Sequence, residues 1–282
     1  MVSIVVTAYN VGKWIEECVE SACRQSHRDI EIIIVEDCST DSTPEKLAGI
    51  KDPRVTVISN CNNMGAGASR RKGIEAARGE YILLLDGDDY IADDFVETLY
   101  RKAVEYDADI VSGGITVMQE NGTCVSSSYG ECCAEGEDKI LKFWGEKVVF
   151  MNNKLIRRSL HRKVPYCKRR FIEDTPVIIP MLYLADKVVY TGNCGYIYRM
   201  NKGSLTHQAS AFKYALFRAL CAEDIITFFE KHDRDFLEKL PFAAAYSQCI
   251  KDLKDCDLDE KVIEPHKDEW IEFTAKLIKR LC

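Results

Sequence analysis

The first hundred residues alternate apolar, often β-branched runs with stretches in which apolar residues recur at helical spacing. These two periodicities are typical of strands and amphipathic helices, respectively. The segment 30–35 is apolar at nearly every position, as expected for a strand covered on both faces. The predicted order is strand 2–7, helix 15–22, strand 30–35, a short helix from 42, strand 55–59, helix 66–77 and strand 81–85. This order indicates an α/β fold with a mostly parallel sheet flanked by helices.

The remainder of the chain is less regular. Asn121-Gly122 lies between β-forming runs and predicts a hairpin, and two further strands are predicted at 187–191 and 195–199. Residues from about 208 to the end are predicted to form three helices, broken near His232 and Asp255. We therefore predict an α/β domain over residues 1–208 and a helical C-terminal extension over residues 209–282. At the short helix, we expect Ser42 to supply the capping hydroxyl.

Composition narrows the possible partners. The 282 residues include 38 Lys or Arg and 45 Asp or Glu, and the resulting net charge of −7 disfavours a nucleic-acid partner. No basic segment precedes the apolar N-terminal run, and no uncharged apolar run approaches the roughly 18 residues of a spanning helix. We therefore expect a cytoplasmic protein. The 13 cysteines show no C-x-x-C or zinc spacing, so we expect reduced, mostly structural thiols.

Polar residues follow three of the predicted strands: Thr7 to Asn10, Glu36-Asp37 and Asp86-Gly87-Asp88-Asp89. Ligands of open α/β sheets bind outside the carboxyl ends of the strands, so one crevice could gather all three groups. Carboxylates on either side of Gly87 could bind Mg²⁺ or Mn²⁺ together with phosphates and water. The alternative is a solvated acidic turn that caps the next helix.

Other polar residues have two interpretations each. Asp37 could accept a hydrogen bond from a base, with Tyr9 as a stacking surface, or it could form an Asx-turn and helix cap. Glu173 and Asp174 stand at the start of a predicted helix, where the helix dipole favours carboxylates whatever their role.

Between Lys154 and Arg170 the chain has eight Lys or Arg residues and no acidic one. This run could bind a diphosphate, an anionic acceptor or membrane headgroups, or it could simply be a solvated basic face. Further candidates for diphosphate or acceptor contact are Glu173, Arg199, Lys202, Ser204 and His207, although a lone His is more often structural.

Familiar catalytic motifs are missing from the sequence. It has no G-x-S-x-G, H-E-x-x-H or P-loop motif, which disfavours the hydrolases that depend on them. The glycines at 65 and 67 read G-x-G-x-x-R and follow the third predicted strand, so they are not a dinucleotide-binding fingerprint.

Four segments in order, at 5–10, 34–41, 63–73 and 85–89, resemble the family 2 glycosyltransferases of the GT-A fold. A weaker match at 153–158, 171–174 and 196–204 is similar to bacterial capsule and lipopolysaccharide transferases. Three positions depart from the pattern of the family. Glu36 and Cys38 replace an aspartate and a glycine of the second motif, and Arg71 stands in place of an asparagine after Arg70.

The resemblance implies a nucleotide-diphosphate sugar donor, with UDP favoured, bound by residues 1–108, and an acceptor bound by residues 109–208. The implied donor contacts are Thr7, Ala8 and Tyr9 around the base, Asp37 on its ring nitrogen with Arg70 beside it, Asp86 near the ribose, Gly87, and Asp88 on Mn²⁺ or Mg²⁺. Asp174 is the implied general base of an inverting transfer.

The implied acceptor is a glycan or a lipid-linked sugar in surface polysaccharide synthesis, reached by peripheral contact with the inner face of the membrane. Two alternatives remain open at this point. One is a nucleotide-sugar hydrolase or nucleotidyltransferase that uses the same carboxylates. The other is a non-catalytic nucleotide-sugar sensor or scaffold.

Overall fold

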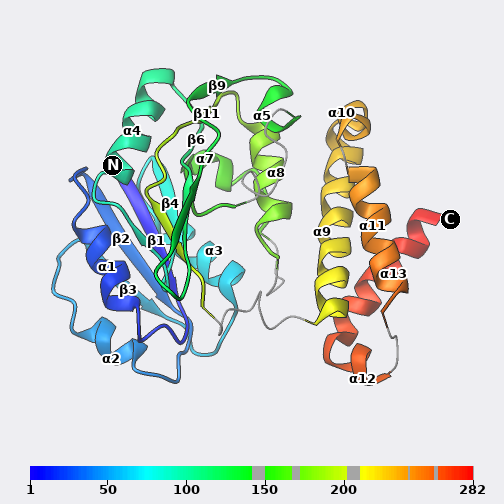
Figure 1. Cartoon of the computed structure of the whole chain (residues 1–282), viewed down its shortest axis with the longest axis horizontal. Coiled ribbons are helices and arrows are strands. Elements are labelled where there is room, and N and C mark those ends of the chain that lie inside the picture. The colour runs from blue at the N-terminus through cyan, green and yellow to red at the C-terminus, as the bar shows by residue number, and fades with distance from the viewer. Residues whose placement is uncertain (142–149, 167–171, 202–209, 241, 257–259, 282) are drawn as a thin grey trace. The chain divides into compact units, whose positions relative to one another are not determined.

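The computed structural model describes residues 1–141, 150–166, 172–201, 210–240, 242–256 and 260–281 (Figure 1). The chain divides into two compact units. The first comprises Met1–Arg170 with Val177–Asn201, and the second comprises Phe171–Pro176 with Lys202–Cys282. The boundary predicted at residue 208 lies outside the described residues. The separate donor and acceptor roles predicted for 1–108 and 109–208 stay predictions.

Among the described residues, the first unit contains an eight-stranded sheet in the order β3-β2-β1-β4-β10-β6-β11-β9. The strands are β1 (Val2–Ala8), β2 (Ile30–Glu36), β3 (Val55–Ser59), β4 (Tyr81–Asp86), β6 (Ile110–Ser112), β9 (Cys132–Ala134), β10 (Lys154–Arg157) and β11 (Val188–Tyr190). β1 to β4 pair in parallel as predicted. β10, which was not predicted, runs antiparallel to both β4 and β6.

A smaller sheet in the described residues has the order β5-β12-β7-β8. Its strands are β5 (Tyr90–Ile91), β7 (Ile115–Met118), β8 (Cys124–Ser127) and β12 (Tyr196–Arg199). The predicted hairpin is confirmed, because β7 and β8 pair antiparallel and Gly122 has a φ of 82°. Glycine adopts this left-handed conformation without steric cost.

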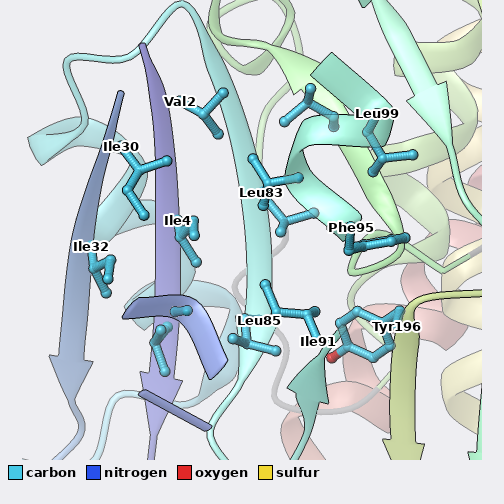
Figure 2. Close-up of a cluster of buried hydrophobic side chains, with 14 of the residues drawn as sticks. Val2, Ile4, Ile30, Ile32, Leu83, Leu85, Ile91, Phe95, Leu99 and Tyr196 are labelled. Atoms are coloured by element: carbon cyan, nitrogen blue, oxygen red, sulfur yellow. The ribbon is translucent and has the colours of Figure 1, made fainter. Parts of the chain in front are cut away.

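Helices cover both faces of the large sheet. They include α1 (Ile15–Cys23), α2 (Thr43–Ala48), α3 (Ala66–Ala76) and α4 (Phe95–Tyr106). Alternate residues of β1, including Val2 and Ile4, join Leu83, Phe95 and Leu99 in one buried cluster with α1 and α4 (Figure 2). α3 packs on the opposite face, against β1 and β2. Burial of apolar side chains on both faces therefore holds the carboxyl ends of the central strands in place.

The start of α2 differs from the prediction. Ser42 precedes the helix but makes no side-chain capping bond. Asp41 takes this role, because its Oδ1 accepts from the backbone N–H of Thr43 and its Oδ2 accepts from that of Gly12, both at 2.9 Å. A carboxylate accepts such bonds more strongly than a hydroxyl does, and it also ties the helix to the turn after β1.

Gly73 allows α3 to approach the sheet closely. A Cβ at this position would lie 2.3 Å from Val5 Cγ1 and 3.2 Å from Val35 Cγ2. We expect Gly73→Val to lower the free energy of unfolding by about 3 kcal/mol, since overpacking displaces both strands. Urea unfolding measures the effect. Gly192→Val is the matched control because a Cβ there meets no atom within 4 Å. Equal stability of the two variants would contradict the close approach.

The second unit is helical. Its elements are α9 (Ala211–His232), α10 (Arg234–Lys239), α11 (Phe242–Lys254), α12 (Glu260–Ile263), η1 (Glu264–His266) and α13 (Lys267–Leu281). The predicted break at His232 is confirmed, because Asp233 is extended and accepts from Phe236 N to cap α10. The prediction of only three helices is wrong, since short helices follow both predicted breaks. Phe212, Leu216 and Leu220 are buried in the core of this unit.

The first unit also contains α5 (Asp138–Leu141) and α7 (Arg158–His161), and α8 (Thr175–Leu184) begins within the 171–176 segment. Across the described parts of the chain, no helix combines the length and the apolar character needed to span a bilayer.

Candidate functional site

The carboxyl ends of β1, β2 and β4 lie side by side, as the sequence predicted. Thr7 is in register with Asp86 on β4, and Ala8 is in register with Glu36 on β2. Asp37 continues directly from β2, and its N–H donates to Ala8 O at 2.9 Å. One edge of the sheet therefore collects the polar groups that follow three different strands.

Asp86 is the centre of a hydrogen-bond network at this edge. Its Oδ1 accepts from Thr7 Oγ1 at 3.1 Å and from Arg70 Nη2 at 2.9 Å, and its Oδ2 accepts from Asn152 Nδ2 at 2.6 Å. Burial alone would raise the pKa of Asp86, but the Arg70 charge and these hydrogen bonds outweigh it and lower the pKa below its ordinary value. Asp86 is therefore ionised at neutral pH.

Asp88 lies two residues further along the turn and is half-buried. Its Oδ2 accepts from Asn201 Nδ2 at 2.9 Å. Burial, together with the charge of Asp86, raises the pKa of Asp88 to about 6. A nearby positive charge would stabilise the ionised form of Asp88 and so offset the effects of burial and of the Asp86 charge.

Asp88 fits a hard divalent cation by its chemistry, because Mg²⁺ and Mn²⁺ prefer carboxylate oxygens. In the described part of the chain, no three His, Cys, Asp or Glu side chains are grouped to hold a metal. Magnesium commonly binds through one or two carboxylates while phosphates and water complete its shell. Asp88 thus suits a cation that is shared with a diphosphate.

Asp89 has a different role from its neighbour. It is buried, and it accepts from Tyr196 Oη at 2.6 Å and from Arg199 N at 2.8 Å. Burial and the charges of Asp88 and Asp86 raise its pKa well above the ordinary value. Asp89 therefore fastens β12 to the acidic turn.

Two contributors to this network were missed by sequence reasoning. Asn152 and Tyr196 hydrogen-bond to each other at 3.2 Å and reach Asp86 and Asp89, respectively. Asn152 belongs to no recognisable motif. Tyr196 begins the weaker match at 196–204 and lies in a predicted strand, but neither signal indicated its contact with Asp89.

Gly87 permits the sharp turn after β4. Its N–H donates to Thr7 O at 2.9 Å, and a Cβ on residue 87 would lie 2.9 Å from both Thr7 O and Val11 Cγ2. Any side chain here would push the acidic turn away from β1. The structure thus gives Gly87 a steric role, while direct contact with a ligand stays a prediction.

Asp37 is buried and holds the turn between β3 and α3. Its Oδ1 accepts from Asn60 Nδ2 and Met64 N, and its Oδ2 accepts from Gly65 N, each at 2.8 Å. Gly65 is the N-cap residue of α3. These bonds match the turn-and-cap alternative. A carboxylate offers about four acceptor sites. The three bonds of Asp37 therefore leave an acceptor site for the predicted bond to a base.

The residues after β1 form a turn beside Asp37. Tyr9 is 45% exposed, which leaves its ring open to a stacking partner, whereas the Ala8 side chain is buried. Asn10 has a φ of 52° and joins this turn to the β2 loop, where its Oδ1 accepts from Thr40 N at 2.9 Å. The structure thus presents one flat aromatic surface at the edge of the sheet.

The remaining predicted site residues have different placements. The Arg199 guanidinium pairs with Glu17 at 2.9 Å and lies 4.9 Å from the ring centroid of Tyr90. Glu173 and Asp174 are half-buried directly before α8, in the 171–176 segment of the second unit. Lys202, Ser204 and His207 lie outside the described residues.

In its described part, residues 154–166, the basic run does not form one continuous anion-binding surface, and Lys168, Arg169 and Arg170 lie outside the described residues. Lys154 is fully buried and donates to Asn153 Oδ1 at 2.8 Å, and Arg157 pairs with Glu80, Asp107 and Asp109. Internal carboxylates and carbonyls thus engage these two cations. Arg158 and Arg162 line a pocket of about 200 Å³ with Glu80 and Arg157.

We expect His161, in the same run, to make the stability of the fold depend on pH. It is buried, its Nδ1 lies 2.5 Å from Tyr166 Oη, and burial lowers its pKa to about 3. Since the pKa is lower in the folded state, stability is complete above about pH 6.5 and declines as the pH falls toward 3. Between pH 6.5 and 4.5 we expect His161 to account for about 2 to 3 kcal/mol of lost unfolding free energy.

Denaturant unfolding at several pH values measures this decline. The His161→Asn variant should have a shallower pH dependence than the wild type, and the exposed His232→Asn variant should match the wild type. Identical slopes for wild type and His161→Asn would show that His161 protonates freely in the folded protein.

Comparison with known proteins places this geometry in context. Residues 3–165 match the family model for glycosyl transferase family 2. Glycosyltransferase GlyG of Streptococcus pneumoniae serotype 4 is 31% identical over 248 residues, which cover 83% of this chain and 80% of GlyG. Escherichia coli WfaP, a UDP-Glc:alpha-D-GlcNAc-diphosphoundecaprenol beta-1,3-glucosyltransferase, is 44% identical over 90 residues, or 32% of this chain and 36% of WfaP.

Solved structures give a consistent picture. The crystal structure of S. aureus TarS 1-349 in complex with UDP-GlcNAc aligns with a TM-score of 0.70 at 20% sequence identity, covering 89% of this chain and 72% of that chain. This likeness confirms the α/β fold that the sequence predicted.

Proposed function

Because the chain belongs to glycosyl transferase family 2 and is a glycosyltransferase of the GT-A fold, we propose that its donor is a nucleotide-diphosphate sugar with uridine as the base. The acceptor is a glycan or a lipid-linked sugar in surface polysaccharide synthesis. The observation that carries this proposal is the convergence of Thr7, Arg70, Asp86 and Asp88 at the carboxyl ends of β1 and β4. The printed names of WfaP and TarS support the choice of UDP.

The donor would lie along this edge of the sheet. Tyr9 offers a stacking surface for the base, and Asp37 offers an acceptor for its ring N–H. Asp86, held ionised beside Arg70, would accept from a ribose hydroxyl. Asp88 would then face the diphosphate.

Charge neutralisation is the first chemical requirement of transfer. Asp88 would hold a Mn²⁺ or Mg²⁺ ion, and the chemistry that such an ion supplies is stabilisation of the departing diphosphate. Asp88 needs to be ionised for this role, which its pKa of about 6 permits at neutral pH.

Proton removal is the second requirement. An acceptor hydroxyl is a weak nucleophile at neutral pH, so we assign Asp174 as the general base that takes its proton. Attack on the anomeric carbon from the face opposite the diphosphate inverts that centre. No covalent sugar–enzyme intermediate is then required.

The Asp88→Asn variant tests the metal assignment. It preserves the shape of the side chain and removes its charge, so we expect the KM for the donor to rise at least tenfold and to lose its dependence on Mn²⁺ concentration. Steady-state kinetics with UDP-sugars measure both effects. Asp94→Asn is the matched control, because Asp94 is exposed and makes no side-chain cap bond to α4. If the KM of Asp88→Asn depended on Mn²⁺ as the wild-type KM does, the assignment of Asp88 as a metal ligand would be wrong.

The same assays separate the rival activities. Release of free sugar in the absence of an acceptor would indicate a nucleotide-sugar hydrolase, and formation of pyrophosphate would indicate a nucleotidyltransferase. Transfer that requires an added acceptor supports the proposed function.

A further inference from the structure

Two free cysteines lie at matching positions beyond neighbouring strands, next to Asp37 and Asn60, which hydrogen-bond to each other. β2 and β3 pair in parallel up to Glu36 and Ser59, and Cys38 and Cys61 each follow two residues later. Asn60 N donates to Glu36 O at 2.8 Å, which continues the pairing beyond the strand ends. The Cys38 thiol already lies 3.7 Å from the carbonyl oxygen of Cys61.

The backbone of Cys38 makes this position unusual. Its φ is 60°, in the left-handed region that favours glycine. A cysteine here adopts an unfavourable backbone conformation, and the matching position after β3 also carries a cysteine. Neighbouring strands are separated by about 4.8 Å, and disulfides need Cα atoms about 4.4 to 6.8 Å apart. The strand spacing is therefore compatible with a bond between the two residues.

We propose that Cys38 and Cys61 are a reversible dithiol–disulfide pair that a low-molecular-weight disulfide oxidises. The exposed Cys61 thiolate attacks the external disulfide, forms a mixed disulfide and releases one thiol. The half-buried Cys38 thiolate then attacks the Cys61 sulfur and releases the second thiol. The two protein thiols are oxidised, and one external disulfide is reduced to two thiols.

Closure of this bond acts on the loop that Asp37 holds. Sulfur atoms in non-bonded contact are more than about 3.5 Å apart, whereas a disulfide joins them at about 2.05 Å. Closure therefore draws Cys38 toward the segment 60–65, whose backbone N–H groups at Met64 and Gly65 bind Asp37. Ser39, the residue after Cys38, accepts from Asn10 N at 3.0 Å, so a shift of Cys38 also reaches the Asn10 turn. Oxidation therefore weakens nucleotide binding. This consequence rests on the proposed function.

Peptide mapping of the full chain tests the bond itself. After incubation with glutathione disulfide and alkylation of the remaining thiols, trypsin should release peptide 29–46 joined to peptide 55–70. Each of these peptides contains one cysteine. Dithiothreitol should separate them. The joined pair should be absent from Cys61→Ser and present in Cys133→Ser, which removes an exposed cysteine elsewhere. Recovery of both peptides only as mixed disulfides or alkylated thiols would overturn the proposal.

Nucleotide binding tests the consequence. We expect the oxidised protein to bind UDP at least fivefold more weakly than the reduced protein, with full recovery in dithiothreitol and no effect of oxidant on Cys61→Ser. Equal affinity of the oxidised and reduced proteins would overturn the claim that the pair controls the donor site. If the reduced protein binds no nucleotide, the proposed function fails, whereas the peptide map still decides whether the disulfide forms.

Discussion

The Asp174→Asn variant is expected to transfer sugar at least about 100-fold more slowly than the wild type while its donor affinity stays within about twofold. A positioned general base contributes about 10² to 10⁴ in rate, and the amide cannot take the proton of the acceptor hydroxyl. Other residues make the proposed donor contacts, so donor binding should persist in this variant. Single-turnover transfer measures the rate, and calorimetry measures the affinity.

Glu173→Gln is the comparison variant for this prediction, because Glu173 is a candidate acceptor contact and not the assigned base. Both residues are half-buried carboxylates directly before α8, so a general effect of charge at this helix start would appear in both variants. A selective loss in Asp174→Asn supports its assignment as the base. A variant that retains more than a tenth of the wild-type rate would rule the assignment out.

The Arg70→Met variant is expected to lose about 3 kcal/mol of unfolding free energy, because it leaves the Asp86 carboxylate without its positively charged partner. Arg70 is 6% exposed, and its Nη2 contacts both oxygens of Asp86, at 2.9 and 3.1 Å. Removing the guanidinium also removes the charge that keeps the pKa of Asp86 low. Urea unfolding measures the loss, and Arg70→Lys should recover part of it.

Arg71→Met provides the comparison on the same helix. Arg71 is exposed and pairs with Glu75 one turn later, and such surface pairs contribute roughly 0.3 to 0.5 kcal/mol. The two variants make the same chemical change at neighbouring positions with different burial. A similarly small loss of unfolding free energy in both variants would mean that the Arg70–Asp86 pair does not stabilise this part of the fold.

The central part of the fold follows from local sequence patterns. β1 to β4 are short apolar runs whose burial on both faces is visible in the sequence, and parallel strands place the residues after them at one edge. Thr7, Asp37 and Asp86 can therefore be grouped from the amino-acid sequence alone. Their proximity is confirmed by the register of the strands.

Other parts of the site depend on pairings between distant segments. Asn152 contacts Asp86, 66 residues away, and Tyr196 contacts Asp89, 107 residues away. Asn152 lies just before the antiparallel strand β10, whose four residues are too few to show a clear hydrophobic period. Asp41 rather than Ser42 binds the start of α2 because Asp41 also reaches Gly12 across the loop. Sequence spacing alone does not reveal that second contact.

We expect the acidic turn after β4 to bind a nucleoside diphosphate together with a divalent cation. Isothermal titration of the wild-type protein with UDP, with and without Mn²⁺, measures this binding. We predict saturable binding that is at least tenfold tighter with Mn²⁺, with GDP and ADP binding more weakly than UDP. If none of the three nucleotides binds with or without Mn²⁺, the carboxylates at this edge of the sheet are not a donor site, and the account is wrong.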